Sequence, residues 1–176
     1  MHINRNVTSA MARMIAMFVM ILAVGFLSPS ADAHHSYAAY DGTQFKVFTG
    51  VMVRIVPNAA HFEMHMVPLN EDRNALVKNE KGEPQVWVLQ MESAAQAIKD
   101  GITKEALPQG SVFTMGFHPL RDGKRGGDRG AAGMVQCPKG ADGKPMVPKP
   151  GMHCDSVPGA KLFGNGVIKE GPVAKK

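Results

Sequence analysis

Histidines and one glutamate are the side chains of this chain best suited to hold a metal ion. They occur near the N-terminus, in a short central run and at one later position. In order, they are His34, His35, His61, Glu63, His65 and His118. Imidazole nitrogens are preferred ligands of copper and zinc, and a carboxylate can complete such a set. These residues predict a site for a divalent metal ion, with copper as the first candidate cofactor.

The residues before His34 predict that it becomes the first residue of the mature protein. Arg5 and Arg13 precede an apolar run over residues 14–27, and Ala31 and Ala33 supply small side chains at the two positions that a signal peptidase reads. We therefore expect residues 1–33 to be a cleaved signal peptide and the mature protein to be periplasmic. The apolar run is shorter than the about 20 residues of a membrane span, so no span is expected after cleavage.

A mature chain that starts at His34 can chelate a metal through its terminus. Its α-amine and its imidazole reach one ion, and a second imidazole completes the T-shaped nitrogen set that copper(II) favours. The alternative is that His34 and His35 form only a soluble start of the chain.

The central run places His61, Glu63 and His65 on one face of a predicted strand. At about 3.3 Å per residue, the two histidines lie roughly 13 Å apart and cannot share one ion. Glu63 with either neighbour could bind one if His34, His35 or His118 added a ligand. The alternative is a polar strand face in solvent. The order of residues differs from the His-Glu-x-x-His of zinc proteases, so that enzyme class is not predicted.

Cys137 and Cys154 are the two cysteines of the chain. In an oxidising periplasm two cysteines pair with each other, so we expect a disulfide that ties off residues 137–154. The alternative is a metal site that includes the adjacent His153, but two sulfurs and one imidazole are a weak zinc signal.

Alternating apolar residues predict strands at 45–55, 61–66, 86–91 and 111–118, and residues 131–136 supply a fifth. In the first strand the expected apolar face consists of Val47, Thr49, Val51, Val53 and Ile55. Ser93 and Gln96 predict the cap of a short helix that ends at Gly101. This order indicates an all-β fold with one short helix, a small five-stranded OB-like barrel. An open antiparallel sheet or a small sandwich would show the same alternation.

One domain is expected, over residues 34–163, followed by a flexible tail at 164–176. Four methionines on the apolar faces of the strands are expected to fill the core, and they are Met64, Met66, Met91 and Met115. The charged loop with Arg121, Lys124, Arg125 and Arg129 is expected to be a solvated loop and not a nucleic-acid site, because few aromatic residues are available for stacking.

Several short motifs, in this order, resemble a family of small secreted bacterial proteins. They are His34-His35-Ser36, Thr49-Gly50-Val51, a Pro/Asn turn before His61, Trp87, residues 107–110 and Leu162-Phe163. The family is catalogued only as a domain of unknown function, number 6152, and the resemblance covers most of residues 34–163. It implies a periplasmic OB-like barrel and no established activity. The chain departs from the family at the turn of residues 57–61 and in the 137–154 excursion.

No phosphate-binding loop, nucleophile motif or pair of catalytic carboxylates is present, so an enzyme is not predicted. The expected function is that of a small periplasmic protein that binds copper or another divalent metal through His34 and nearby histidines. The alternative is a non-enzymatic interaction module that docks an envelope protein or a polymer, with no metal.

Overall fold

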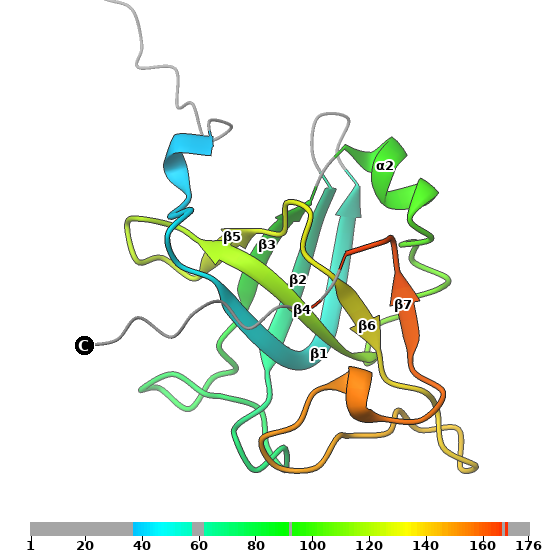
Figure 1. The fold of residues 1–176 in the computed structure, drawn as a ribbon. Coiled ribbons are helices and arrows are strands. Elements are labelled where there is room, and N and C mark those ends of the chain that lie inside the picture. The colour runs from blue at the N-terminus through cyan, green and yellow to red at the C-terminus, as the bar shows by residue number, and fades with distance from the viewer. Residues whose placement is uncertain (1–36, 58–61, 92, 167, 169–176) are drawn as a thin grey trace, which may run out of the picture. The chain divides into compact units, whose positions relative to one another are not determined.

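The computed structural model describes residues 37–57, 62–91, 93–166 and 168. This part of the chain consists mostly of strands with one short α-helix (Figure 1). In chain order the elements are the 3₁₀ helix η1 (Tyr37–Ala39), β1 (Lys46–Pro57), β2 (Phe62–Pro68), β3 (Trp87–Met91), α2 (Ala94–Lys99), β4 (Val112–Pro119), β5 (Gly126–Asp128), β6 (Met134–Gln136), the 3₁₀ helix η2 (Cys154–Ser156) and β7 (Lys161–Phe163).

Five strands close into a barrel because β1 pairs on both of its sides. It lies antiparallel to β2 and to β4, β2 pairs antiparallel with β3, and β5 joins β3 to β4. The β3–β5 pairing is parallel, whereas the β4–β5 pairing is antiparallel. Beyond the barrel, β6 and β7 extend the sheet from β4. The prediction of an OB-like barrel with one short helix is confirmed.

The predicted apolar face of the first strand is wrong over most of its length. The side chains that point inward are Phe48, Met52 and Ile55, whereas Thr49 and Val51 point outward. A bulge between Met52 and Arg54 adds one residue, so Met52 before it and Ile55 after it face the core, and the predicted face is correct only beyond the bulge, at Ile55. Strict alternation therefore cannot describe this strand.

The fifth barrel strand also differs from the prediction. It is β5, which lies inside the segment expected to be a glycine-rich loop, while Met134–Gln136 forms β6 outside the barrel. A Cβ on Gly127 would lie 2.3 Å from Cδ2 of Phe117, so only glycine lets this strand approach the core. A strand built on two glycines has no hydrophobic alternation that sequence reasoning could detect.

The barrel core contains the four methionines predicted for it, and each of them is buried. Their aromatic and aliphatic neighbours include Phe62, Leu89, Phe113 and Phe117. The predicted helix cap is confirmed, since Oγ of Ser93 accepts a hydrogen bond from the backbone N of Gln96 at 3.3 Å. The helix ends before Gly101, whose φ of +81° suits glycine. Within the described residues, no helix is long and apolar enough to cross a membrane.

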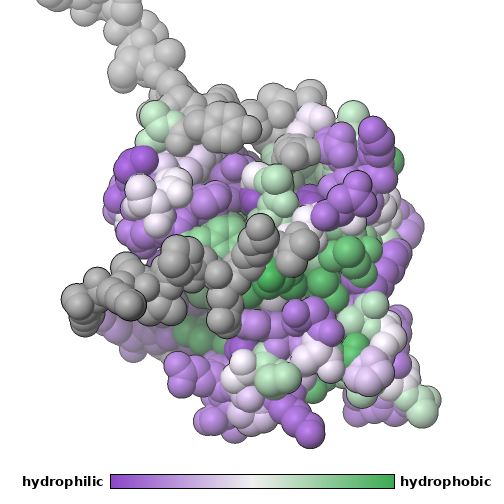
Figure 2. Space-filling model, viewed as in Figure 1, coloured by the Kyte–Doolittle hydropathy of each residue, from purple (hydrophilic) through white to green (hydrophobic). Residues whose placement is uncertain are grey.

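A second hydrophobic cluster lies outside the barrel, over the outer faces of β4 and β6. It contains Val112, Val135, Cys137 and Cys154, and Val51 packs against it. The predicted disulfide is confirmed, with both cysteines buried. In Figure 2 hydrophobic residues gather in the middle of this side of the protein, with hydrophilic residues above and below them. The segment after Cys137 thus covers apolar surface that the barrel alone leaves open.

Hydrogen bonds attach the same segment to the barrel wall. Oγ1 of Thr114 accepts a bond from the backbone N of Cys154 at 2.9 Å and shares another with Oγ1 of Thr49 at 2.7 Å. Oγ1 of Thr49 also lies 2.8 Å from Nδ1 of His153. Because these hydroxyl groups are buried, each bond prevents the cost of an unsatisfied polar group.

Replacing both cysteines by alanine should destabilise the protein without unfolding the barrel. The lost loop constraint predicts a decrease of about 3 kcal/mol in the free energy of unfolding, measured in urea. Dithiothreitol should have a comparable effect on the wild type and none on the variant. Two free thiols in the unfolded, unreduced protein would contradict the disulfide.

Candidate metal centre

Four polar residues form a row across the outside of the barrel, which we call the polar row. Strand register pairs Glu63 of β2 with Gln90 of β3, Gln90 with Asp128 of β5, and Asp128 with His118 of β4. All four point outward, because their strand neighbours Met64, Leu89, Gly127 and Phe117 face the core. The row brings two carboxylates and one imidazole to a single face.

The segment before β1 is fixed beside this row. The backbone N of Asp41 donates to the carbonyl O of Pro119 at 2.8 Å, and the backbone N of Arg121 donates to the carbonyl O of Ala39 at 2.9 Å. The phenol of Tyr40 donates to Oε1 of Gln90 at 2.5 Å. Burial, followed by the charges of Asp128 and Glu63, raises the pKa of Tyr40 to about 12. The phenol therefore stays protonated and remains a donor at neutral pH.

His118 is oriented so that one ring nitrogen can bind a metal. Its Nδ1 lies 2.7 Å from the carbonyl O of Gln44, and its ring centroid lies 5.4 Å from that of Phe45. A carbonyl oxygen can only accept, so Nδ1 carries the hydrogen and the neutral ring keeps its lone pair on Nε2. Imidazoles that ligate metals are commonly held in this way by a backbone carbonyl.

His65 and Glu63 form a second pair on β2. Nε2 of His65 lies 3.6 Å from Oε2 of Glu63, which is longer than a hydrogen bond. This Nε2 atom is buried and has no hydrogen-bond partner among the described residues. Burial lowers the pKa of His65, the nearby Arg54 lowers it further, and Glu63 opposes both. The imidazole is therefore neutral at pH 7, the form that binds metals.

The described residues divide the predicted ligands into two places. Glu63 and His65 lie together on β2. His118 lies three strands away on β4, roughly 14 Å along the barrel wall at about 4.8 Å per strand, and its partner there is Asp128. His118 therefore does not complete a site at Glu63. Within the described residues, no group of three His, Cys, Asp or Glu side chains could hold one ion. The predicted ligands His34, His35 and His61 lie outside the described residues.

Sequence reasoning missed Asp128 and Tyr40 as parts of this face. Asp128 belongs to the glycine strand β5, and Tyr40 reaches Gln90 across 50 positions of the sequence. Both contacts join residues that are far apart in the sequence, so no local motif indicates them.

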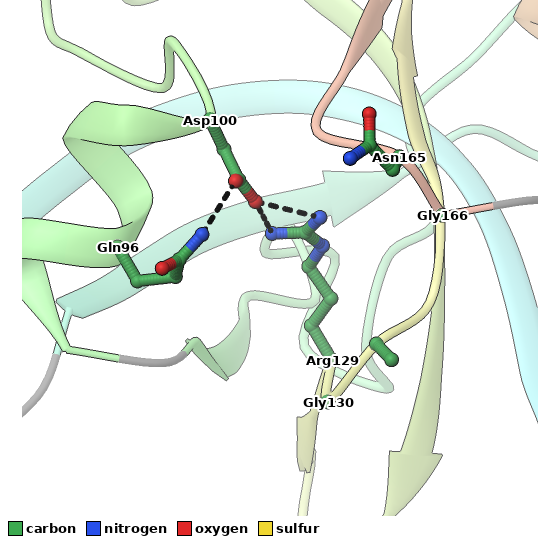
Figure 3. A pocket seen from close by; sticks show the side chains of 7 residues that line it. Gln96, Asp100, Arg129, Gly130, Asn165 and Gly166 are labelled. Atoms are coloured by element: carbon green, nitrogen blue, oxygen red, sulfur yellow. Dashed lines mark hydrogen bonds and ion pairs between the residues drawn. The ribbon is translucent and has the colours of Figure 1, made fainter.

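A cavity of about 250 Å³ lies between α2 and the β5–β6 loop (Figure 3). It is lined by Gln96, Asp100, Arg129, Gly130, Ala131, Asn165 and Gly166. Both terminal nitrogens of Arg129 donate to Oδ2 of Asp100, at 3.1 and 3.2 Å, and its Nε donates to the carbonyl O of Ala132 at 2.7 Å. Nε2 of Gln96 donates to the other carboxylate oxygen of Asp100 at 2.8 Å.

The expectation that Arg129 lies on a solvated loop is therefore wrong, because its side chain is only 4% exposed. Burying a guanidinium requires a charged partner, and Asp100 at the end of α2 supplies it. The other three cations of the predicted loop are exposed, as expected: Arg121, Lys124 and Arg125. We interpret the Arg129–Asp100 pair as a link between helix and barrel.

The chain belongs to a family of unknown function (DUF6152), whose family model matches residues 23–129. No curated protein and no solved structure matches the chain significantly. The family match ends just after β5, so the disulfide and β6 lie beyond the matched residues, whereas Val112 of the second cluster lies within them.

The pKa of His65 predicts how stability depends on pH. An unfolded histidine titrates near pH 6.5 and the folded one lower, so stability is full above about pH 6.5 and decreases as pH falls through the folded pKa. His65→Gln should flatten this decrease. Glu63→Gln should enlarge it, because the carboxylate that favours the charged ring is lost. Urea unfolding between about pH 8 and pH 5 measures both, and equal pH profiles for the three proteins would contradict the assignment.

Removing the guanidinium of Arg129 should be costly. Arg129→Met leaves Asp100 without its partner and should lower the free energy of unfolding by about 3 kcal/mol, measured in urea. The double variant Arg129→Met/Asp100→Leu should recover most of that loss, because no buried charge remains. Additive losses in the double variant would show that the two residues are not coupled.

Proposed function

We propose that this member of the family is a periplasmic protein that binds copper(II), or another divalent ion, through the terminal amine and imidazole of His34 and through His118. Asp128 lies next to His118 and adds negative charge to the site. The proposed role is metal binding and not catalysis.

One observation carries the proposal: the segment that leads back to His34 is attached beside a correctly oriented imidazole. The carbonyl O of Ala38 accepts a hydrogen bond from Nε of Arg121 at 3.1 Å, three positions after His118. His34 lies four residues before Ala38, so the chain can span at most about 14 Å between their Cα atoms. This reach is the basis on which we propose that the amine and imidazole of His34 act together with His118.

The chemistry of these groups favours copper(II). The proposed site has three nitrogen ligands. Two are the α-amine and the imidazole of His34, and the third is the imidazole of His118. Copper(II) prefers such a set. The amine must lose its proton, with a free pKa of roughly 7.7 to 8.0, so affinity should increase with pH over this range. His65 and Glu63 are the alternative ligands, since Nε2 of His65 is neutral and lacks a hydrogen-bond partner among the described residues.

A second candidate function is an interaction module without metal. Leu162 on β7, the outermost strand of the described sheet, is 52% exposed. It borders an apolar groove of about 300 Å³ that Val135, Ala160 and Ile168 also line. An exposed strand edge next to such a groove is a common docking surface for an extended peptide.

Calorimetric titration with copper(II) tests the metal proposal on protein purified from the periplasm, whose intact mass gives the mature start. A mature start at His34 is expected. His118→Ala should weaken binding by about tenfold or more, because one of three nitrogen ligands is lost. A variant with one glycine inserted before His34 should lose at least as much, since it separates the amine from the imidazole.

His65→Ala is the matched control, because it removes an imidazole from the same face but not from the proposed site. Its affinity for copper should equal that of the wild type. If His65→Ala loses affinity and His118→Ala does not, the site lies on β2 instead. If the wild type does not bind copper, or starts elsewhere than at His34, the proposal fails.

A further inference from the structure

The end of the barrel opposite α2 presents the only tryptophan of the chain. Trp87 opens β3, whereas α2 follows the other end of that strand. Its ring packs edge-on against Phe48, with centroids 4.9 Å apart, and tilted against Phe117 at 5.6 Å. Phe117 is fully buried, but Trp87 remains partly exposed. The indole therefore forms the surface layer of the aromatic core at this end, which we call the barrel mouth.

One cation lies over the ring, and a second occupies the neighbouring position on the adjacent strand. Nζ of Lys46 lies 5.4 Å from the Trp87 ring centroid. Arg125 comes beside Trp87 because β3 and β5 run parallel, with Val88 opposite Gly126 and the backbone N of Val88 donating to the carbonyl O of Arg125 at 3.1 Å. Successive residues of a strand point to opposite faces, so residue 125 lies on the same face as Gly127. This is the core-facing side, to which Trp87 also belongs.

Among the described residues, Lys46 and Arg125 lack the carboxylate partners that the other cations of the loop between β4 and β5 have. Arg121 and Lys124 each have a nearby carboxylate, Asp41 at 3.8 Å and Asp122 at 3.1 Å. Lys46 and Arg125 form no salt bridge with any described residue. The barrel mouth thus carries two positive charges without a counter-ion from the described chain, next to an aromatic surface.

We propose that the barrel mouth binds an acidic oligosaccharide. Lys46 and Arg125 would hold carboxylates of neighbouring sugar units, and the apolar C–H face of one sugar ring would lie on the exposed part of Trp87. The positive charges of Lys46 and Arg125 favour an anionic ligand. The single partly exposed indole, that of Trp87, favours a ligand that stacks through one ring. Single-stranded nucleic acid fits less well, because it needs several open aromatic faces in succession. The proposal is independent of the metal site.

The single tryptophan provides the readout. Titrating the full mature protein with trigalacturonate should give a saturable change in tryptophan fluorescence, and maltotriose of equal length should give none. Added salt should weaken the binding, because the cations lie at the surface. Lys46→Gln and Arg125→Gln should each weaken it by about tenfold. Lys124→Gln is the matched control, and it should bind like the wild type because its charge is already paired.

Calorimetry should give the same order of affinities, and circular dichroism should show that each variant is folded. The proposal is overturned if trigalacturonate causes no saturable change, or if maltotriose binds equally well. It is also overturned if a short oligothymidylate binds more tightly, or if Lys124→Gln loses as much affinity as Lys46→Gln.

Discussion

Double pairing of β1 is the constraint on which the rest of this structure depends. One strand forms a ladder with β4 over residues 46–51 and with β2 over residues 50–57, and the bulge between Met52 and Arg54 bends it just beyond the residues that both ladders share. Gly50 lies where both ladders meet, and a Cβ there would approach Cε of Met66 to 2.3 Å. Without this bend the sheet would stay open, and the methionine-rich face would lack the enclosure that buries it.

Barrel closure also determines which chemical groups meet. The parallel β3–β5 pairing inserts Asp128 between Gln90 and His118, and it places Arg125 next to Trp87 at the other end of the same short strand. A three-residue strand thus serves the proposed metal site and the proposed sugar site. Its glycines allow close approach to the core, so Arg125, which precedes the strand, and Asp128, which ends it, are held at defined places on the barrel surface.

Several polar groups that look functional by residue type support the fold instead. Arg129 is buried against Asp100, and the hydroxyls of Thr49 and Thr114 hold the segment that the disulfide closes. These contacts attach the helix and the C-terminal segment to the barrel from two sides. The remaining polar groups of the outer face, including His65 and His118, lie on barrel strands whose positions these contacts help to fix.

The sequence alone determined the fold class, the helix cap at Ser93 and the methionine core, because each follows from a local pattern of residues. It also determined the disulfide, because the chain has only two cysteines. It could not determine the inward face of β1, since one bulge residue reverses side-chain parity without changing composition. It could not reveal β5 either, because glycines carry no hydrophobic signal. The separation of His118 from Glu63, the row that Asp128 completes and the burial of Arg129 result from pairings between distant strands and loops. Only the tertiary structure decides these, because strand order around a closed barrel is not encoded in the spacing of residues along the chain.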